Sequence, residues 1–206
     1  MMPALALGAG IGLLLAGQAF AQDLAKAQGT ASQICASCHA PDGNSTAPAN
    51  PKIAAQFPEY LNKQLRDFKA QAGKKPARES AVMNGMVASL SDADMKGLAA
   101  YYGSQKLKAA VATDKDQVAL GQKLWRGGNA EQGIPACSGC HGPAGAGIPG
   151  QYPRLAGQFP EYIAAQLKLF RDGARANDPA GVMRGVTARM SERDINAVAQ
   201  YAAGLR

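Results

Sequence analysis

The chain has 206 residues, of which 47% are hydrophobic and 18% charged, and its formal net charge is +7. This length suits one large domain or two small ones, and the low aromatic content of 6% favours helix over sheet. Lys and Arg are scattered without a long run, which favours a solvated basic surface over a nucleic-acid site.

The first segment, residues 1–21, has the pattern of a signal peptide. An apolar stretch ends in the small-residue pattern Ala19-Phe20-Ala21, which predicts cleavage after Ala21 and a mature chain from Gln22. The apolar run of about thirteen residues is short for a bilayer span. No Lys or Arg precedes it, so the basic n-region is weak and the true start could lie upstream. An uncleaved membrane anchor is the alternative. Export places the protein in an oxidising compartment, and we expect the bacterial periplasm.

The remaining chain contains an internal repeat with a unit of about 90 residues, longer than a solenoid repeat. Three segments of the first half return about one hundred positions later, with 3 of 7, 7 of 10 and 6 of 13 letters unchanged. The matched segments are ICASCHA at 34–40 with ACSGCHG at 136–142, PKIAAQFPEY at 51–60 with PRLAGQFPEY at 153–162, and VMNGMVASLSDAD at 82–94 with VMRGVTARMSERD at 182–194. We therefore predict two homologous domains, residues 22–103 and 118–206, joined by a polar linker at 104–117.

Each domain is predicted to hold about three helices. Residues 23–34 and 116–128 form the first, leading towards the repeated cysteine pair. The second begins where Pro stands in the first turn beside an acid. These starts are Phe57-Pro58-Glu59 and Phe159-Pro160-Glu161, and the helices run through Phe68 and Phe170.

The third helix of each domain starts with a capping pattern, Ser91-x-x-Asp94 or Ser191-x-x-Asp194. Each has an apolar stripe at helical spacing. The stripes are Met95, Leu98, Ala99 and Tyr102, then Ile195, Val198, Ala199 and Ala202. Gly- and Pro-rich loops, such as 40–51 and 142–153, separate the helices. So much loop buries little core, which suggests an all-α fold built around a large prosthetic group.

All four cysteines and both histidines lie in two copies of Cys-x-x-Cys-His, which is the attachment word of a c-type haem. The two thiols add to the vinyl groups of the porphyrin, and the adjacent His coordinates the iron. The word predicts two covalent haems, held through Cys35, Cys38, Cys137 and Cys140, with His39 and His141 as iron ligands.

Three other uses of these residues are weaker. A thioredoxin-like dithiol needs a βαβ setting that is absent here. The cysteine pairs of a zinc ribbon lie much closer together than these. Structural disulfides would leave both histidines unexplained.

The sixth ligand must come from another residue, since no other His remains, and a thioether is a suitable soft donor. Comparison of the halves selects Met83 and Met183, because only these are Met in both copies. Each precedes x-Gly, which predicts a loop that approaches the ring closely. Met86 and Met190 are the alternatives.

The function of several other residues stays open. The carbonyls of Pro51 and Pro153 could accept a hydrogen bond from the ligating His, or these prolines could only stiffen a loop. Lys52 and Arg154 could face a haem propionate or be solvated. Trp125, which has no counterpart in the first half, is either a packing residue or a haem neighbour.

Both haem words, the Pro-x-x-Ala-x-Gln segments and the Met-x-Gly segments together resemble the cytochrome c4 family of exported di-haem cytochromes c. The resemblance covers nearly all of the mature chain and implies two tandem class I cytochrome c domains. Position by position, it implies thioether bonds at the four cysteines, His39 and His141 as proximal ligands, and Met83 and Met183 as distal ligands. It also implies that Pro51 and Pro153 support these histidines, and that the haem propionate edges lie close together.

The resemblance further implies an electron carrier, rather than an enzyme, between a respiratory donor and a terminal oxidase, with peripheral attachment to the membrane. His and Met on both faces leave the iron no open position, so we expect outer-sphere transfer. Docking on acidic partners should slow as salt rises. The alternatives are a cytochrome subunit of a periplasmic dehydrogenase and, less favoured, a di-haem peroxidase.

Overall fold

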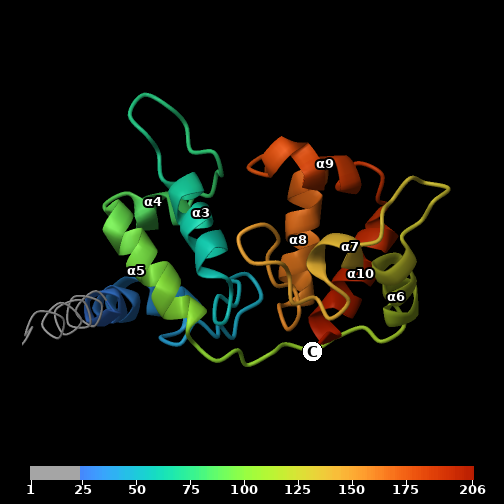
Figure 1. Cartoon of the computed structure of the whole chain (residues 1–206), viewed down its shortest axis with the longest axis horizontal. Coiled ribbons are helices and arrows are strands. Elements are labelled where there is room, and N and C mark those ends of the chain that lie inside the picture. The colour runs from blue at the N-terminus through green and yellow to red at the C-terminus, as the bar shows by residue number, and fades with distance from the viewer. Residues whose placement is uncertain (1–23) are drawn as a thin grey trace, which may run out of the picture.

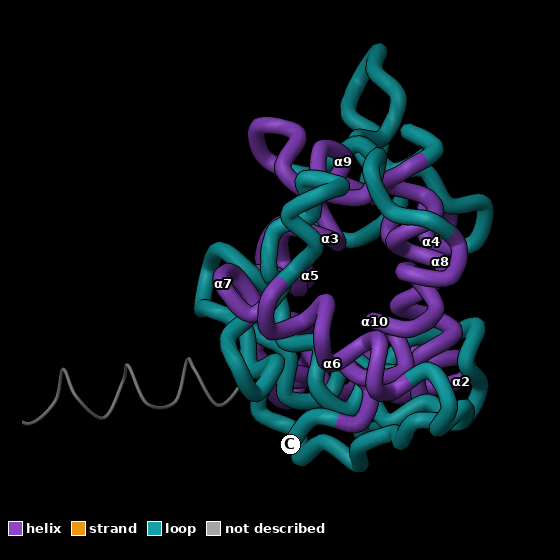
Figure 2. Tube along the Cα trace, turned by 90° about the vertical axis from the view of Figure 1, so that its right-hand side faces the viewer, coloured by secondary structure: helices purple, strands orange, loops and turns teal. Residues whose placement is uncertain are grey.

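The computed structural model describes residues 24–206, so the predicted signal peptide lies outside the described part. Within that part the chain is helical, and only isolated β-bridges occur instead of strands. Figure 2 accordingly shows helices and loops alone over these residues. The prediction of an all-α fold is therefore confirmed.

The first domain contains a helical stretch at residues 24–30 that continues without a break into the first cysteine pair. A π-helical turn, η1 (Ala31–Cys35), lies immediately before the turn that carries the His; such turns occur often at functional sites. The following elements are α2 (Ala36–His39), α3 (Pro58–Phe68), α4 (Met83–Val87) and α5 (Asp92–Gly103).

The second domain repeats this order, but a loop separates its first helix from the cysteine pair. The elements are α6 (Val118–Gly127), α7 (Ser138–His141), α8 (Pro160–Arg171), the 3₁₀ turn η2 (Pro179–Gly181), α9 (Val182–Thr187) and α10 (Glu192–Gly204). The helix starts at Pro58 and Pro160 agree with the sequence prediction. Both predicted capping boxes form, with Ser91 and Ser191 accepting from the backbone N–H three residues on.

Each domain has its own core, built on its last helix. The predicted apolar stripes of α5 and α10 are buried throughout, at 3% exposure or less for every residue of both. Residues from α3 complete the first core and residues from α6 and α8 the second. In the second domain α6 crosses α10 closely at Gly121, where a Cβ would stand only 2.1 Å from the Ala197 carbonyl oxygen.

The two domains lie side by side, and the connecting segment runs along one edge of both (Figure 1). The Asn44 side chain accepts from the Lys108 N–H and donates to the Lys106 carbonyl, which fixes the start of this segment on the first domain. The Ala110 N–H donates to the Gly157 carbonyl oxygen at 2.7 Å, which fixes its middle on the second. Within residues 24–206, none of the helices has the length and apolar character needed to cross a bilayer.

Candidate functional site

A cavity of about 1040 Å³ lies between the domains and takes its lining from both. It is larger than most sites for a single small molecule. The first half contributes His39, Met83 and Met86 to its wall, and the second half contributes His141 and Met183. The structure thus brings the four predicted iron ligands to the surface of one cavity.

Hydrogen bonds fix both histidines in the neutral tautomer that can bind a metal through Nε2. The Nδ1 atom of His39 lies 2.9 Å from the Pro51 carbonyl oxygen, and that of His141 lies 3.0 Å from the Pro153 oxygen. Because a carbonyl can only accept, each Nδ1 carries the proton and each Nε2 presents a lone pair. Burial lowers the pKa of both rings, although the carbonyls oppose this effect. In the described part of the chain, the buried Nε2 of His141 has no protein partner, as a metal-ligating nitrogen requires.

The last four residues of each Cys-x-x-Cys-His word form a single helical turn, α2 or α7, which the first Cys precedes and which ends at the His. The four thiols are unpaired in the structure, so they form no disulfide. Burial raises the pKa of Cys35, and it raises that of Cys137 to about 11. Reactive dithiols need a lowered thiol pKa, so the surroundings of these two thiols do not suit redox exchange. Nor do three or more His, Cys, Asp or Glu side chains in residues 24–206 gather into a metal cluster.

The methionines occupy distinct environments. Met83 and Met183 are partly buried at the cavity wall. The alternative Met190 is instead buried in the second core. Met86 also borders the cavity but is 47% exposed, and the second half has Val186 at the matching position. One local expectation was wrong: Met83 and Met183 lie in the short helices α4 and α9, not in loops. The glycines that follow need no special backbone angle, and a Cβ on either would meet nothing within 4 Å.

Trp125 is a core residue. It is 1% exposed in the cluster formed by α6 and α10 and is not part of the cavity wall. Its indole lies 6.3 Å from the ring of His141, and its N–H donates to the Pro143 carbonyl oxygen at 3.3 Å. Trp125 therefore packs in the second core, and this packing reaches the ring of His141.

Two buried arginines border the cavity, and the sequence analysis missed both. Arg78 donates to Gln64 at 2.7 Å and to Gln166 of the other domain at 2.7 Å. Arg175 mirrors it, donating to Gln166 at 2.8 Å and to Gln64 at 3.0 Å. Their guanidinium groups stack on Phe68 and Phe170 respectively. The repeat conceals the pair, because the loop before each Met differs in length between the halves.

The arginines give the cavity a positive edge. Burial alone would raise the pKa of Tyr60, but Arg175 and Arg78 outweigh it and lower that pKa. Among the hydrogen bonds and ion pairs of the described residues, neither guanidinium pairs with a carboxylate. Buried cations of this kind suit an anionic group such as a propionate, so the donors and charges here fit haem.

Lys52 and Arg154 also lie at the cavity wall and at the domain boundary. The Lys52 ammonium donates to the Ser45 carbonyl at 3.0 Å and lies 4.7 Å from the centre of the Phe159 ring. It is thus held by protein groups, not free in solvent. The Nε of Arg154 is buried and lacks a partner among the described residues.

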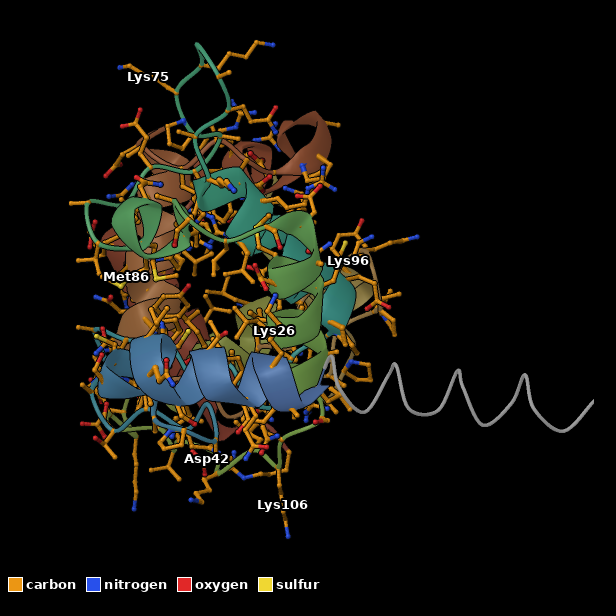
Figure 3. All side chains as sticks on the ribbon, turned by 90° about the vertical axis from the view of Figure 1, so that its left-hand side faces the viewer. Lys26, Asp42, Lys75, Met86, Lys96 and Lys106 are labelled. Atoms are coloured by element: carbon orange, nitrogen blue, oxygen red, sulfur yellow. The ribbon has the colours of Figure 1, made fainter. Side chains whose placement is uncertain are left out.

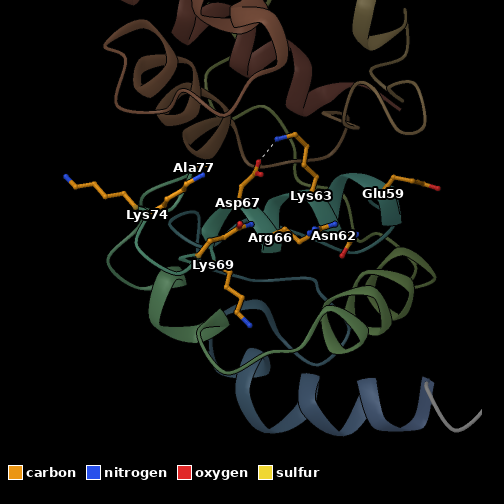
Figure 4. Close-up of a pocket in the computed structure, with 10 residues that line it drawn as sticks. Glu59, Asn62, Lys63, Arg66, Asp67, Lys69, Lys74 and Ala77 are labelled. Carbon is orange, nitrogen blue, oxygen red and sulfur yellow. Dashed lines mark hydrogen bonds and ion pairs between the residues drawn. The ribbon is translucent and has the colours of Figure 1, made fainter.

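A second cavity of about 470 Å³ borders the outer part of α3 and contains no Cys, His or Met. Figure 4 shows the charged side chains around it, including the ion pair of Lys63 with Asp67. Asn177 of the second domain also donates to Asp67, at 2.6 Å. All the residues that line this cavity belong to the first domain, and it offers no cofactor ligands.

Comparison with known proteins gives consistent matches. The cytochrome c family model matches the chain twice, over residues 22–106 and 118–205. Cytochrome c4 from Azotobacter vinelandii is 47% identical over 193 residues, covering 90% of each protein. The thiosulfate dehydrogenase electron acceptor from Thiomonas intermedia is 40% identical, covering 82% of this chain and 77% of that protein. The crystal structure of reduced recombinant cytochrome c4 from Pseudomonas stutzeri superposes with a TM-score of 0.82 at 43% identity, covering 89% of this chain and 98% of that one.

Proposed function

Because the chain belongs to the cytochrome c4 family of di-haem cytochromes c, we propose that it carries single electrons between respiratory partners in the periplasm. Proteins of this family hold haem c covalently, and the two domains account for two haems. The observation that carries the proposal is the convergence of a neutral His and a Met from each half on one cavity.

The ligand assignment follows from that convergence. We assign the thioether bonds to Cys35, Cys38, Cys137 and Cys140, and the axial positions to His39 with Met83 and His141 with Met183. A bound haem supplies an iron that takes up or releases one electron. With a His and a Met of the protein both bound to it, the iron would have no site left for oxygen or peroxide, and the Met would favour the reduced state.

The dispersed positive charges of the surface suit transient docking of a protein partner better than binding of a nucleic acid. Lys75 and Lys96 project from separate parts of the first domain, and Lys106 projects from the linker on the same side of the molecule (Figure 3). Dispersed positive charge speeds association with an acidic partner and loses that effect as salt rises. We propose a terminal oxidase as the electron acceptor and a peripheral attachment of the protein to the membrane. We also propose that residues 1–21 direct export and are removed by cleavage after Ala21.

Spectroscopy of the purified protein tests the proposal. We expect two haems per chain that resist acid–acetone extraction, low-spin iron in both oxidation states, and the charge-transfer band of Met-ligated ferric haem. Extractable pigment would contradict covalent attachment. A high-spin fraction that turns over peroxide would instead support the peroxidase alternative. Mass spectrometry of the exported protein checks whether its first residue is Gln22.

A second candidate function is supported by relatives whose names state it. Thiosulfate dehydrogenase electron acceptors are 40% and 37% identical to this chain. The chain would then accept electrons from one periplasmic dehydrogenase instead of serving several partners. Rapid reduction by a purified thiosulfate dehydrogenase with thiosulfate, and co-purification of the two, would favour this candidate. Rapid reduction by a respiratory donor and oxidation by a terminal oxidase would favour the first.

A further inference from the structure

Two buried glutamines exchange hydrogen bonds across the domain boundary. Gln158 of the second domain accepts from the Lys52 N–H at 2.9 Å and donates to the Lys52 carbonyl at 2.7 Å. Gln56 of the first domain does the same to Arg154, with both bonds at 3.0 Å. Each side chain therefore satisfies both backbone groups of one residue in the other domain.

The bonded residue is in each case the one after the proline that supports the His. The Lys52 N–H and the Pro51 carbonyl belong to one planar peptide group. That peptide accepts from His39 through its oxygen and donates to Gln158 through its nitrogen. The result is a continuous chain of hydrogen bonds from the second domain to the axial ligand of the first.

The mirror chain runs in the opposite direction. The peptide between Pro153 and Arg154 accepts from His141 through its oxygen and donates to Gln56 through its nitrogen. Both glutamines are 9% exposed, so their bonds lie in a region of low dielectric constant where they are strong.

The orientation of each amide is fixed by its own domain. The Gln56 oxygen also accepts from the Phe57 N–H at 3.0 Å, and the Gln158 oxygen from the Phe159 N–H at 3.1 Å. These N–H groups stand at the starts of α3 and α8. Two donors on one oxygen leave the amide NH₂ to reach the carbonyl across the boundary, which explains why Gln-Phe-Pro recurs unchanged in both halves.

We propose that Gln56 and Gln158 are crossed positioning residues, each tuning the haem of the other domain through the peptide that supports its His. This inference rests on the proposed function, since it requires His39 and His141 to be iron ligands. Donation to Gln158 polarises the Pro51–Lys52 peptide, so its carbonyl accepts more strongly from His39. The imidazole then donates more electron density to the iron, which stabilises the ferric state.

Two variants that replace the amide by an apolar side chain test the crossing. Gln158→Leu should raise the reduction potential of the haem held by His39 and leave that of the His141 haem unchanged. Gln56→Leu should do the reverse. We expect the equilibrium constant for electron exchange between the haems to change by about twofold to tenfold, in opposite directions in the two variants. Paramagnetic NMR during a redox titration of the holoprotein assigns each potential to its domain.

Amide hydrogen exchange gives a readout that does not depend on the iron. The Lys52 N–H should exchange about tenfold faster in Gln158→Leu, and the Arg154 N–H in Gln56→Leu. Gln200→Leu is the matched control, because this amide also accepts from backbone N–H groups, those of Thr113 and Asp114, but has no path to a His. It should leave both potentials and both amides unchanged.

The outcomes separate the inference from the function on which it rests. A wild-type protein without two His–Met haems would contradict the proposed function. If the wild type has both haems but each Leu variant shifts its own domain's haem, or both equally, the crossed assignment is wrong. Should a Leu variant fail to fold, Gln158→Asn and Gln56→Asn shorten the amide without removing it, and the same crossed pattern is required of them.

Discussion

Met183 and Met190 are seven positions apart in the second domain but have different surroundings. Met183 is partly buried at the cavity wall, whereas Met190 is 5% exposed in the core. Only Met183 recurs in the first half, as Met83, because position 90 is a leucine. Comparison of the repeats therefore distinguishes Met183, a candidate ligand, from Met190, a packing residue. The presence of a Met in the second half could not by itself make this distinction.

This difference predicts opposite phenotypes for two alanine variants. Met190→Ala should cost about 2–5 kcal/mol of unfolding free energy, as expected for a buried Met, and leave the absorption spectrum unchanged. Met183→Ala should remove the charge-transfer band of one haem and make that iron high-spin. Denaturant unfolding and ferric absorption spectra measure the two effects. A high-spin iron in Met190→Ala would mean that the ligand is misassigned.

Arg78 illustrates what the sequence could not supply. Its role depends on burial beside the cavity and on partners from the other domain. Neither property leaves a local pattern in the sequence. The equivalent Arg175 lies at a different spacing from its Met, so the repeat gave no signal.

Removing this cation should lower the reduction potential of a haem bound in the cavity, because a nearby positive charge stabilises the reduced iron. We expect Arg78→Gln to lower the equilibrium constant for reduction of the more affected haem by on the order of tenfold. Arg78→Lys keeps the charge and should retain most of the potential. Arg66→Gln makes the same charge change on the exposed side of α3 and should have little effect. Spectroelectrochemical titration measures all three, and equal shifts in Arg78→Gln and Arg66→Gln would contradict the prediction.

At the scale of elements, the sequence predicted what local chemistry determines. Pro in the first turn located the starts of α3 and α8, and the Ser-x-x-Asp pattern located those of α5 and α10. The short helices α4 and α9 were missed because five or six residues give too few turns for a periodic pattern. The cross-domain hydrogen bonds were missed for another reason, since they depend on how two folded domains meet.

One difference between the repeats is explained by the linker. Ala55 and Gly157 both have a positive φ, of 55° and 74°. A Cβ at Gly157 would lie 2.7 Å from the Cβ of Ala109 in the linker. The second half therefore needs glycine for both angle and space, whereas the first half tolerates alanine at the cost of a strained backbone.

Substitutions at these two positions should act in opposite directions. Ala55→Gly should stabilise the protein by about 0.5–1 kcal/mol, because glycine relieves the left-handed strain. Gly157→Ala should destabilise it by about 2–4 kcal/mol through strain and collision with the linker. Gly150→Ala is the control for strain alone, since its φ is 74° and a Cβ there meets nothing within 4 Å. Thermal unfolding measures all three, and equal losses in the two glycine variants would show that the linker contact has no effect.

At the scale of the whole molecule, an ion pair attaches the linker to the first domain. The Lys108 ammonium lies 2.8 Å from a carboxylate oxygen of Asp42, and the Asn44 N–H donates to the other oxygen. Lys108 and, less strongly, Asn44 lower the pKa of Asp42 to about 2. The unfolded or detached form has the ordinary value near 4. Because the folded pKa is the lower one, this contact stabilises the attached linker above about pH 4 and is lost as the pH falls towards 2.

Limited proteolysis with pepsin, which is active in this range, tests that window. Cleavage within residues 104–117 of the wild type should quicken relative to Asp42→Asn as the pH falls from about 4 to about 2. At the upper end the variant should be cut about twofold to fivefold faster, a modest factor because the pair is exposed. At the lower end the two rates should converge, since protonation removes the same charge. Asp172→Asn, which breaks an exposed pair with Arg171 away from the linker, should match the wild type throughout. A constant ratio between wild type and Asp42→Asn over this range would mean that the side chain acts by its shape and not by its charge.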